Sequence, residues 1–113
     1  MKPEGSALPL VLLLVAFAAS LAEPRFQGEA RSGDVVRTII IERSPASICG
    51  VRLVQARRVG DPPASYRQRL LVASDCDCDL KPDGLDPLFD PAENAEAFAG
   101  GIAACRALLA AQD

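Results

Sequence analysis

The sequence predicts a small α+β domain, in which an antiparallel three-stranded β-meander carries one C-terminal helix packed on it and is held by two disulfides. Three observations lead to this fold class. Three β-rich segments follow one another between turn-forming residues, the last segment has a helical apolar period, and the 113-residue chain contains four cysteines. We expect the folded domain to occupy residues 34–113.

Residues 1–22 are expected to be a signal peptide. Lys2 precedes an apolar run from Leu8 to Ala19, and small residues follow, which is the pattern of a secretory signal cleaved after Ala22. The alternative is an uncleaved membrane anchor, but residues 7–22, counted generously, number only 16, whereas roughly 20 span a bilayer. We therefore expect a secreted or periplasmic protein with no transmembrane segment after cleavage.

The β-rich part of the chain follows the signal peptide. Residues 23–33 show no periodicity and are expected to be a flexible lead-in. Strands are predicted at residues 35–43, 48–59 and 66–74, because β-branched and other apolar residues recur there. The segment 60–65 contains two prolines, so it is expected to be a loop between the last two strands.

The clearest helix is predicted after Asp90. This residue is expected to cap the helix, with Pro91 at the first helical position and Glu93 at the third. An apolar stripe then recurs at helical spacing, formed by Phe98, Ile102, Cys105 and Leu109, with Leu108 beside it. Gly100 and Gly101 interrupt the helix at a cost of about 1 kcal/mol each. A close approach of the helix to the sheet would explain them, and a kink is the alternative.

The four cysteines are expected to form the disulfides Cys49–Cys76 and Cys78–Cys105. Pairing Val59 with Tyr66 in the second hairpin places Cys49 opposite Cys76, and Cys78 is then left to reach Cys105 on the helix. A shift of two residues gives the alternative pairs Cys49–Cys78 and Cys76–Cys105. A metal site built from all four thiolates is a further alternative, but the sequence lacks the paired C-x2-C motifs of structural zinc.

An aspartate-rich segment follows the third predicted strand. Its spacing is similar to that of an EF-hand calcium loop, because five aspartates fall at positions 1, 3, 5, 9 and 12 of a twelve-residue window: Asp75, Asp77, Asp79, Asp83 and Asp86. However, Leu80 stands where an EF-hand needs glycine, and two cysteines interrupt the loop. We therefore expect no bound metal and interpret the segment as a solubilising acidic loop, with calcium binding as the alternative.

Charge is unevenly distributed along the chain. Residues 23–72 hold nine arginines and five acidic residues, a net charge of +4, whereas residues 73–113 hold two basic and nine acidic residues, a net charge of −7. With Val59 opposite Tyr66, four arginines are expected to share the sheet face away from the helix: Arg52, Arg58, Arg67 and Arg69. We interpret this face as a candidate surface for an anionic partner. Solvated arginine side chains without a partner are the alternative.

Composition excludes several function classes. The chain has no histidine, which removes Ser-His and Cys-His catalysis and HExxH zinc sites, so we expect no catalytic residues and no cofactor. Its acidic half and few aromatic residues argue against nucleic-acid binding. We expect an exported binding module stabilised by disulfides, whose partner is an unknown protein or an anionic surface. The alternative is a redox-active module in which Cys76 and Cys78 exchange between partners.

Overall fold

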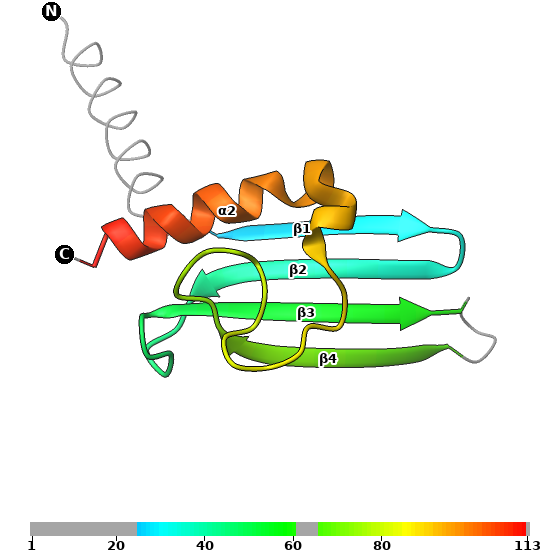
Figure 1. Cartoon of the computed structure of the whole chain (residues 1–113), viewed down its shortest axis with the longest axis horizontal. Helices are drawn as coiled ribbons and strands as arrows, with labels where there is room; N and C mark the ends of the chain where they lie inside the picture. Colours follow the sequence, from blue (N-terminus) through cyan, green and yellow to red (C-terminus); the bar gives the residue numbers. More distant parts are fainter. Residues whose placement is uncertain (1–24, 61–65, 113) are drawn as a thin grey trace, which may run out of the picture.

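The computed structural model describes residues 25–60 and 66–112, and the predicted signal peptide lies outside these residues. Four strands form one antiparallel sheet in chain order: β1 (Phe26–Ser32), β2 (Val35–Arg43), β3 (Val51–Val59) and β4 (Arg67–Ser74). A 3-10 helix, η1 (Pro91–Asn94), leads into the α-helix α2 (Ala95–Ala110). The helix lies on one face of the sheet (Figure 1). The predicted α+β class, with its antiparallel sheet, C-terminal helix and two disulfides, is therefore confirmed.

The prediction of three strands is wrong, because the segment expected to be a flexible lead-in forms β1. Each residue of β1 pairs with β2, from Phe26 opposite Ile41 to Ser32 opposite Val35. The strand is inconspicuous in the sequence because its core-facing positions hold a single large apolar residue, Phe26, followed by Gly28 and Ala30. The hairpin between β1 and β2 turns at Gly33, whose φ of 62° suits glycine.

The pairing of β3 with β4 differs by one residue from the expected register. Val59 lies opposite Arg67 rather than Tyr66. Because alternate residues of a strand point to opposite faces, a one-residue shift moves every side chain of β4 to the other face. Leu70 and Val72, which the pairing of Val59 with Tyr66 would place on the helix side, are consequently 60% and 51% exposed. Leu71, which that pairing would place on the opposite face, is half-buried.

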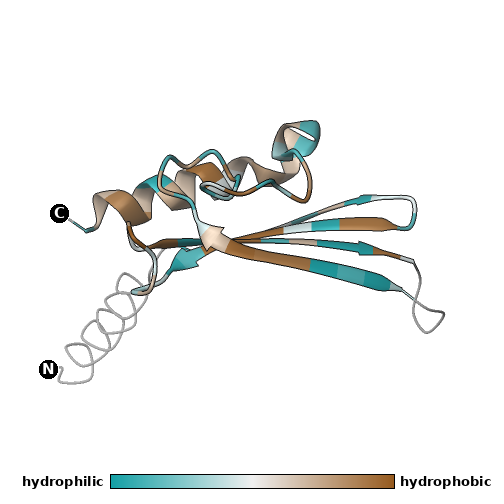
Figure 2. Ribbon diagram, turned by 60° about the horizontal axis from the view of Figure 1, so that its bottom comes forward, coloured by the Kyte–Doolittle hydropathy of each residue, from teal (hydrophilic) through white to brown (hydrophobic). Residues whose placement is uncertain are grey.

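The core lies between the sheet and α2. It contains Ile39 and Ile41 of β2, Leu53 of β3, and Phe98 and Leu108 of α2. The predicted helical stripe thus faces the sheet. Figure 2 shows the helix layer on one side of the sheet, with the hairpin ends of the strands extending past it.

The two glycines in α2 mark a close approach to β1, as one of the two sequence interpretations expected. A Cβ atom at Gly100 would lie 2.9 Å from the Phe26 ring, and one at Gly101 would lie 3.0 Å from it. Gly28 of β1 contributes to the same contact, because a Cβ there would lie 2.9 Å from the backbone oxygen of Ala97. Three glycines therefore make room for one phenylalanine ring between helix and strand.

The helix starts with one turn of 3-10 geometry before it becomes α-helical. Asp90 caps this turn, because its Oδ1 accepts a hydrogen bond from the backbone N–H of Ala92 at 3.0 Å. Pro91 occupies the first helical position, as predicted. The α-helix itself begins at Ala95, four residues later than the capping pattern alone indicates.

The long loop between β4 and η1 completes the layer on the helix side of the sheet. Gln55 of β3 is fully buried beneath it and binds its backbone at three points. The Gln55 Nε2 group donates to the carbonyl oxygens of Leu80 (2.9 Å) and Phe89 (3.4 Å), and its Oε1 accepts from the N–H of Leu88 (2.9 Å). One amide side chain therefore ties two separate segments of the loop to the sheet.

Candidate functional site

The arginines expected to share one face lie on both faces of the sheet. Arg52 and Arg58 point away from the helix, as predicted, whereas the shifted register places Arg67 and Arg69 on the helix side. Arg58 lies opposite Gln68, not opposite Arg67. The predicted four-arginine face is therefore wrong, and the cause is the single-residue change in register.

Arg52 and Arg58, on the face of the sheet away from the helix, both contact neighbouring side chains. Arg52 Nε donates to Glu42 Oε2 at 2.9 Å, and Arg25 Nε donates to Glu42 Oε1 at 3.4 Å. The hydrogen bond from Arg52 holds the pKa of Glu42 below its usual value. The guanidinium carbon of Arg58 lies 5.8 Å from the centroid of the Tyr66 ring, within the range of a cation–π contact.

A different group of arginines lies side by side on the helix side of the sheet. Arg37 of β2 is the direct neighbour of Arg57 of β3, which is the direct neighbour of Arg69 of β4. We call Arg37, Arg57 and Arg69 the arginine row. Arg67 lies on the same face, two residues before Arg69. Neighbouring strands are about 4.8 Å apart, so the backbones of the three arginines span roughly 10 Å of sheet.

The arginine row begins where the cover of the sheet ends. Two residues before Arg57, Gln55 is buried under the loop, whereas Arg37 and Arg57 are partly exposed and Arg69 is exposed. Within residues 25–60 and 66–112, no carboxylate forms an ion pair with any of the three. Like charges directly opposite each other in a sheet repel. A negatively charged group bound beside the row would reduce this repulsion.

Sequence reasoning missed Arg37 and Arg57, although a signal for both was present. Arg37 lies two residues before Ile39, and Arg57 lies two residues after Gln55. In a strand, residues two apart share a face. The alternation therefore assigned both arginines to the helix side, but it did not show that the helix layer would end before reaching them.

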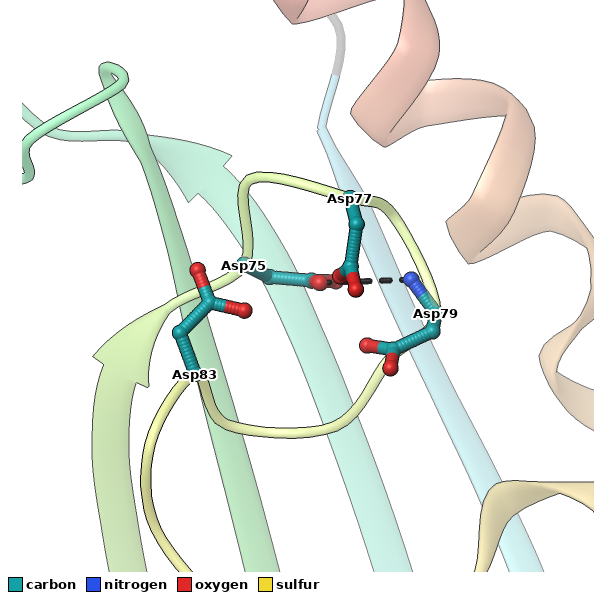
Figure 3. A group of neighbouring side chains, drawn as sticks. All are labelled: Asp75, Asp77, Asp79 and Asp83. Atoms are coloured by element: carbon teal, nitrogen blue, oxygen red, sulfur yellow. Dashed lines mark hydrogen bonds between the residues drawn. The ribbon is translucent and has the colours of Figure 1, made fainter.

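The acidic loop brings four of its five aspartates together. One carboxylate oxygen from each of Asp75, Asp77, Asp79 and Asp83 lies within 4.8 Å of the others. Figure 3 shows the four side chains converging across the curl of the loop. Asp86, the twelfth residue of the window, is not part of this group. We call residues 75–83 the aspartate loop; within residues 25–60 and 66–112, its four carboxylates form a group that could hold a divalent cation.

Asp75 organises the aspartate loop through its backbone. Its side chain is fully buried, and its two oxygens accept hydrogen bonds from the N–H groups of Asp79 (3.2 Å) and Leu80 (3.0 Å). To form this curl, Cys78 and Leu80 adopt positive φ angles of 58° and 64°. Leu80 thus takes the left-handed conformation for which an EF-hand loop uses glycine, at a cost of about 1–2 kcal/mol.

The other aspartates of the loop also bind backbone groups. Asp79 Oδ1 accepts from the N–H of Lys81, and Asp83 Oδ2 accepts from the N–H of Cys76, both at 2.9 Å. Local hydrogen bonds therefore account for much of the convergence of these carboxylates.

Burial raises the pKa of Asp75 to about 7. The side chains of Asp79 and Asp77 contribute to this rise, whereas the hydrogen bond from the Leu80 N–H opposes it. A buried carboxylate is costly because the protein interior solvates charge poorly, and nearby carboxylates add repulsion. At neutral pH, Asp75 is consequently only partly ionised, and the negative charge of the loop is smaller than its number of aspartates suggests.

The four cysteines form two disulfides, Cys49–Cys76 and Cys78–Cys105, which is the first of the two pairings predicted. Their Cα–Cα distances are 5.7 and 5.6 Å. Cys78 and Cys105 belong to the core, and Cys49 packs against it. The adjacent cysteines of the C-x-C motif thus belong to different disulfides, one joining the two ends of the β3–β4 region and the other joining the loop to α2.

Comparison with models of protein families, with curated proteins and with solved structures finds no match to this chain. In the part of the chain that the structure describes, neither helix is long and apolar enough to span a membrane.

Proposed function

We propose that this protein is a binding module whose arginine row takes an acidic segment of a protein. The observation that carries the proposal is the direct cross-strand adjacency of Arg37, Arg57 and Arg69. The sheet holds three like charges together where no described carboxylate pairs with them. An anionic ligand bound at the row relieves that repulsion. The same ligand gains no such stabilisation at a surface of the chain without clustered arginines.

The spacing of the arginine row suits carboxylates on an extended chain. Alternate side chains of an extended segment are about 7 Å apart, so two acidic side chains of such a segment fit within the roughly 10 Å of sheet that the arginine row covers. Arginine also donates paired hydrogen bonds to a carboxylate, which gives geometry as well as charge. Nucleic acid fits less well, because base recognition relies on stacking against exposed aromatic side chains, and the exposed Tyr66 lies against Arg58, on the face away from the arginine row.

Export to an oxidising compartment belongs to the same proposal. Two disulfides stabilise this small domain. Small domains that depend on disulfides for stability are typical of secreted and periplasmic proteins. The apolar run at Leu8–Ala19, expected to be a signal peptide, supports the same compartment.

Fluorescence anisotropy with a labelled oligo-aspartate peptide tests the proposed function. The double variant Arg57→Ser/Arg69→Ser removes two members of the row, and we expect about tenfold weaker binding, which corresponds to about 1.4 kcal/mol. The variant Arg31→Ser/Arg106→Ser is the matched control, because it removes the same net charge from exposed positions outside the row. Equal losses in the two variants, or no binding by the wild-type protein, would contradict the proposal.

A further inference from the structure

The outer edge of β4 is open along its central residues. In the described part of the chain, β4 pairs with β3 and forms the edge of the sheet. The N–H of Asp75, just past the end of β4, donates to the carbonyl of Val51 in β3 at 3.4 Å. Because hydrogen-bonded pairs alternate in an antiparallel ladder, the odd-numbered residues of β4 bond to β3. The even-numbered ones direct their backbone groups outward: Gln68, Leu70, Val72 and Ser74.

The aspartate loop closes this edge at one end. The outward carbonyl of Ser74 accepts a hydrogen bond from the N–H of Asp83 at 3.0 Å. The backbone groups that face solvent are therefore those of Gln68, Leu70 and Val72. The side chains of Leu70 and Val72 are 60% and 51% exposed. An exposed edge strand that carries apolar side chains is a template for another strand.

We propose that β4 pairs antiparallel with β4 of a second copy of this chain, with Leu70 opposite Leu70 of the second copy. This register is centred on the three outward-facing residues, so Gln68 of each copy pairs with Val72 of the other. All the outward N–H and C=O groups of these residues then find partners. The pairing ends on each side where the aspartate loop closes the edge.

Charge complementarity selects a second copy as the occupant. β4 begins with Arg67 and Arg69 and leads into the aspartate loop, and Figure 2 shows its first residues hydrophilic and later ones hydrophobic. Antiparallel pairing places the basic end of each copy beside the acidic end of the other. In the proposed register, Arg67 lies opposite Ala73 of the second copy, two residues before its Asp75. The arginines and the aspartate loop also occupy the same face, because Gln55 on that face binds the loop.

This inference rests on the proposed function at the β4 end of the arginine row, because it brings the aspartate loop of a second copy towards Arg69 and the neighbouring Arg67. The arginine row of each molecule ends at Arg69 on β4, next to the paired edge. The dimer would join two four-stranded sheets into one sheet of eight strands with both helices on the same side. Its contacts combine a backbone ladder, a leucine pair at the twofold axis and two clusters of opposite charge.

Sedimentation velocity over roughly 1–500 µM protein tests the dimer. The wild-type sedimentation coefficient should rise with concentration, and Leu70→Lys should abolish the rise by placing two lysines directly opposite each other. Gln27→Lys is the matched control at the other edge of the sheet, on β1, and should behave as wild type. Wild-type protein that stays monomeric, or a dimer that survives Leu70→Lys, would overturn the proposal.

Cysteine variants test the register. Leu70→Cys should form an intermolecular disulfide under mild oxidation, because directly opposite hydrogen-bonded residues have Cα atoms about 5.5 Å apart. Gln68→Cys alone should not, because its partner position is Val72 of the second copy. An intermolecular disulfide in Gln68→Cys, together with none in Leu70→Cys, would contradict this register.

The oligo-aspartate titration separates this inference from the proposed function. Leu70→Lys should remain able to bind the peptide, because the arginine row is intact. A wild-type monomer that binds the peptide through Arg57 and Arg69 would sink the dimer and leave the proposed function standing. A wild-type monomer that does not bind it would sink both.

Discussion

Arg57 of β3 lies directly opposite Arg69 of β4, on the side of the sheet that carries the helix. Arg37 of β2 extends this contact to a third strand. The loop buries Gln55, whereas Arg37 and Arg57 are partly exposed and Arg69 is exposed, so the row lies at the boundary between the covered and the bare sheet. This placement makes three like charges available to one ligand, which is the basis of the proposed function.

Stability should fall as pH rises from about 4 to 7. The carboxyl group of an unfolded aspartate loses its proton near pH 3.8, whereas burial raises the pKa of Asp75 to about 7 in the folded protein. Between these values the folded state holds a proton that the unfolded state has released, so deprotonation favours unfolding. We expect the free energy of unfolding to drop by about 2 kcal/mol from pH 5 to pH 7.5, measured by urea denaturation in a metal chelator.

Asp75→Asn is the control for this pH dependence, because it removes the ionisable group and retains an acceptor oxygen. Its unfolding free energy should be nearly flat over the same range. The lowered pKa of Glu42 acts below its ordinary value of 4.5 and so does not enter this window. A wild-type protein that becomes more stable between pH 5 and pH 7.5 would show that Asp75 ionises without cost.

Calcium at about 1 mM should leave the melting temperature unchanged. A ligand stabilises a protein only by binding its folded state, and Asp86, which would supply the last ligand of an EF-hand loop, lies outside the cluster. Both oxygens of Asp75 already accept backbone hydrogen bonds. A rise in melting temperature that disappears in Asp79→Asn would instead identify the aspartate loop as a cation site.

Removal of the two disulfides should have unequal effects. Both close loops with a sequence separation of 27 residues, so the chain-entropy contribution of each is about 3–4 kcal/mol. Cys78 and Cys105 are 5% and 0% exposed, so Cys78→Ala/Cys105→Ala also leaves unfilled space in the core. We expect this variant to be about 1–2 kcal/mol less stable than Cys49→Ala/Cys76→Ala, as measured by urea denaturation. Equal losses would mean that the core closes around the missing sulfurs.

Gln55→Leu should destabilise the protein by about 2–4 kcal/mol. The substitution leaves the N–H of Leu88 and the carbonyls of Leu80 and Phe89 without their partner in a buried place. Gln27→Leu, on an exposed position of β1, should change stability by less than about 0.5 kcal/mol. Thermal unfolding followed by circular dichroism measures both. Similar values for the two variants would contradict the role of Gln55 as the link between sheet and loop.

The apolar alternation and the helical stripe were sufficient to predict most of the fold. Val35–Arg43 forms a strand with the predicted bounds, and Phe98, Cys105 and Leu108 face the core as expected. β1 could not be predicted in the same way, because it is held by backbone pairing and by one ring, Phe26, rather than by an apolar pattern.

The binding surface was less predictable than the fold. The sequence of residues 60–65 does not predict which residues of the flanking strands pair, and a one-residue change of register moves both Arg67 and Arg69 to the other face of the sheet. The disulfides were insensitive to this change because Cys49 and Cys76 lie beyond the strand ends at Val51 and Ser74. Outside the strands the backbone is not held by ladder pairing, so the two cysteines can still meet when the strand register shifts by one residue.

Binding of an acidic segment by the arginine row is tested most directly by the response of the arginine side chains to oligo-aspartate in solution. Two-dimensional NMR resolves the Nε–Hε signal of each arginine, and single Arg→Lys variants assign them. We expect the chemical-shift changes on titration to be largest for Arg37, Arg57 and Arg69, with the signals of Arg31 and Arg106 unchanged. Shifts of equal size at Arg31 and Arg106, or shifts absent from the arginine row, would contradict it.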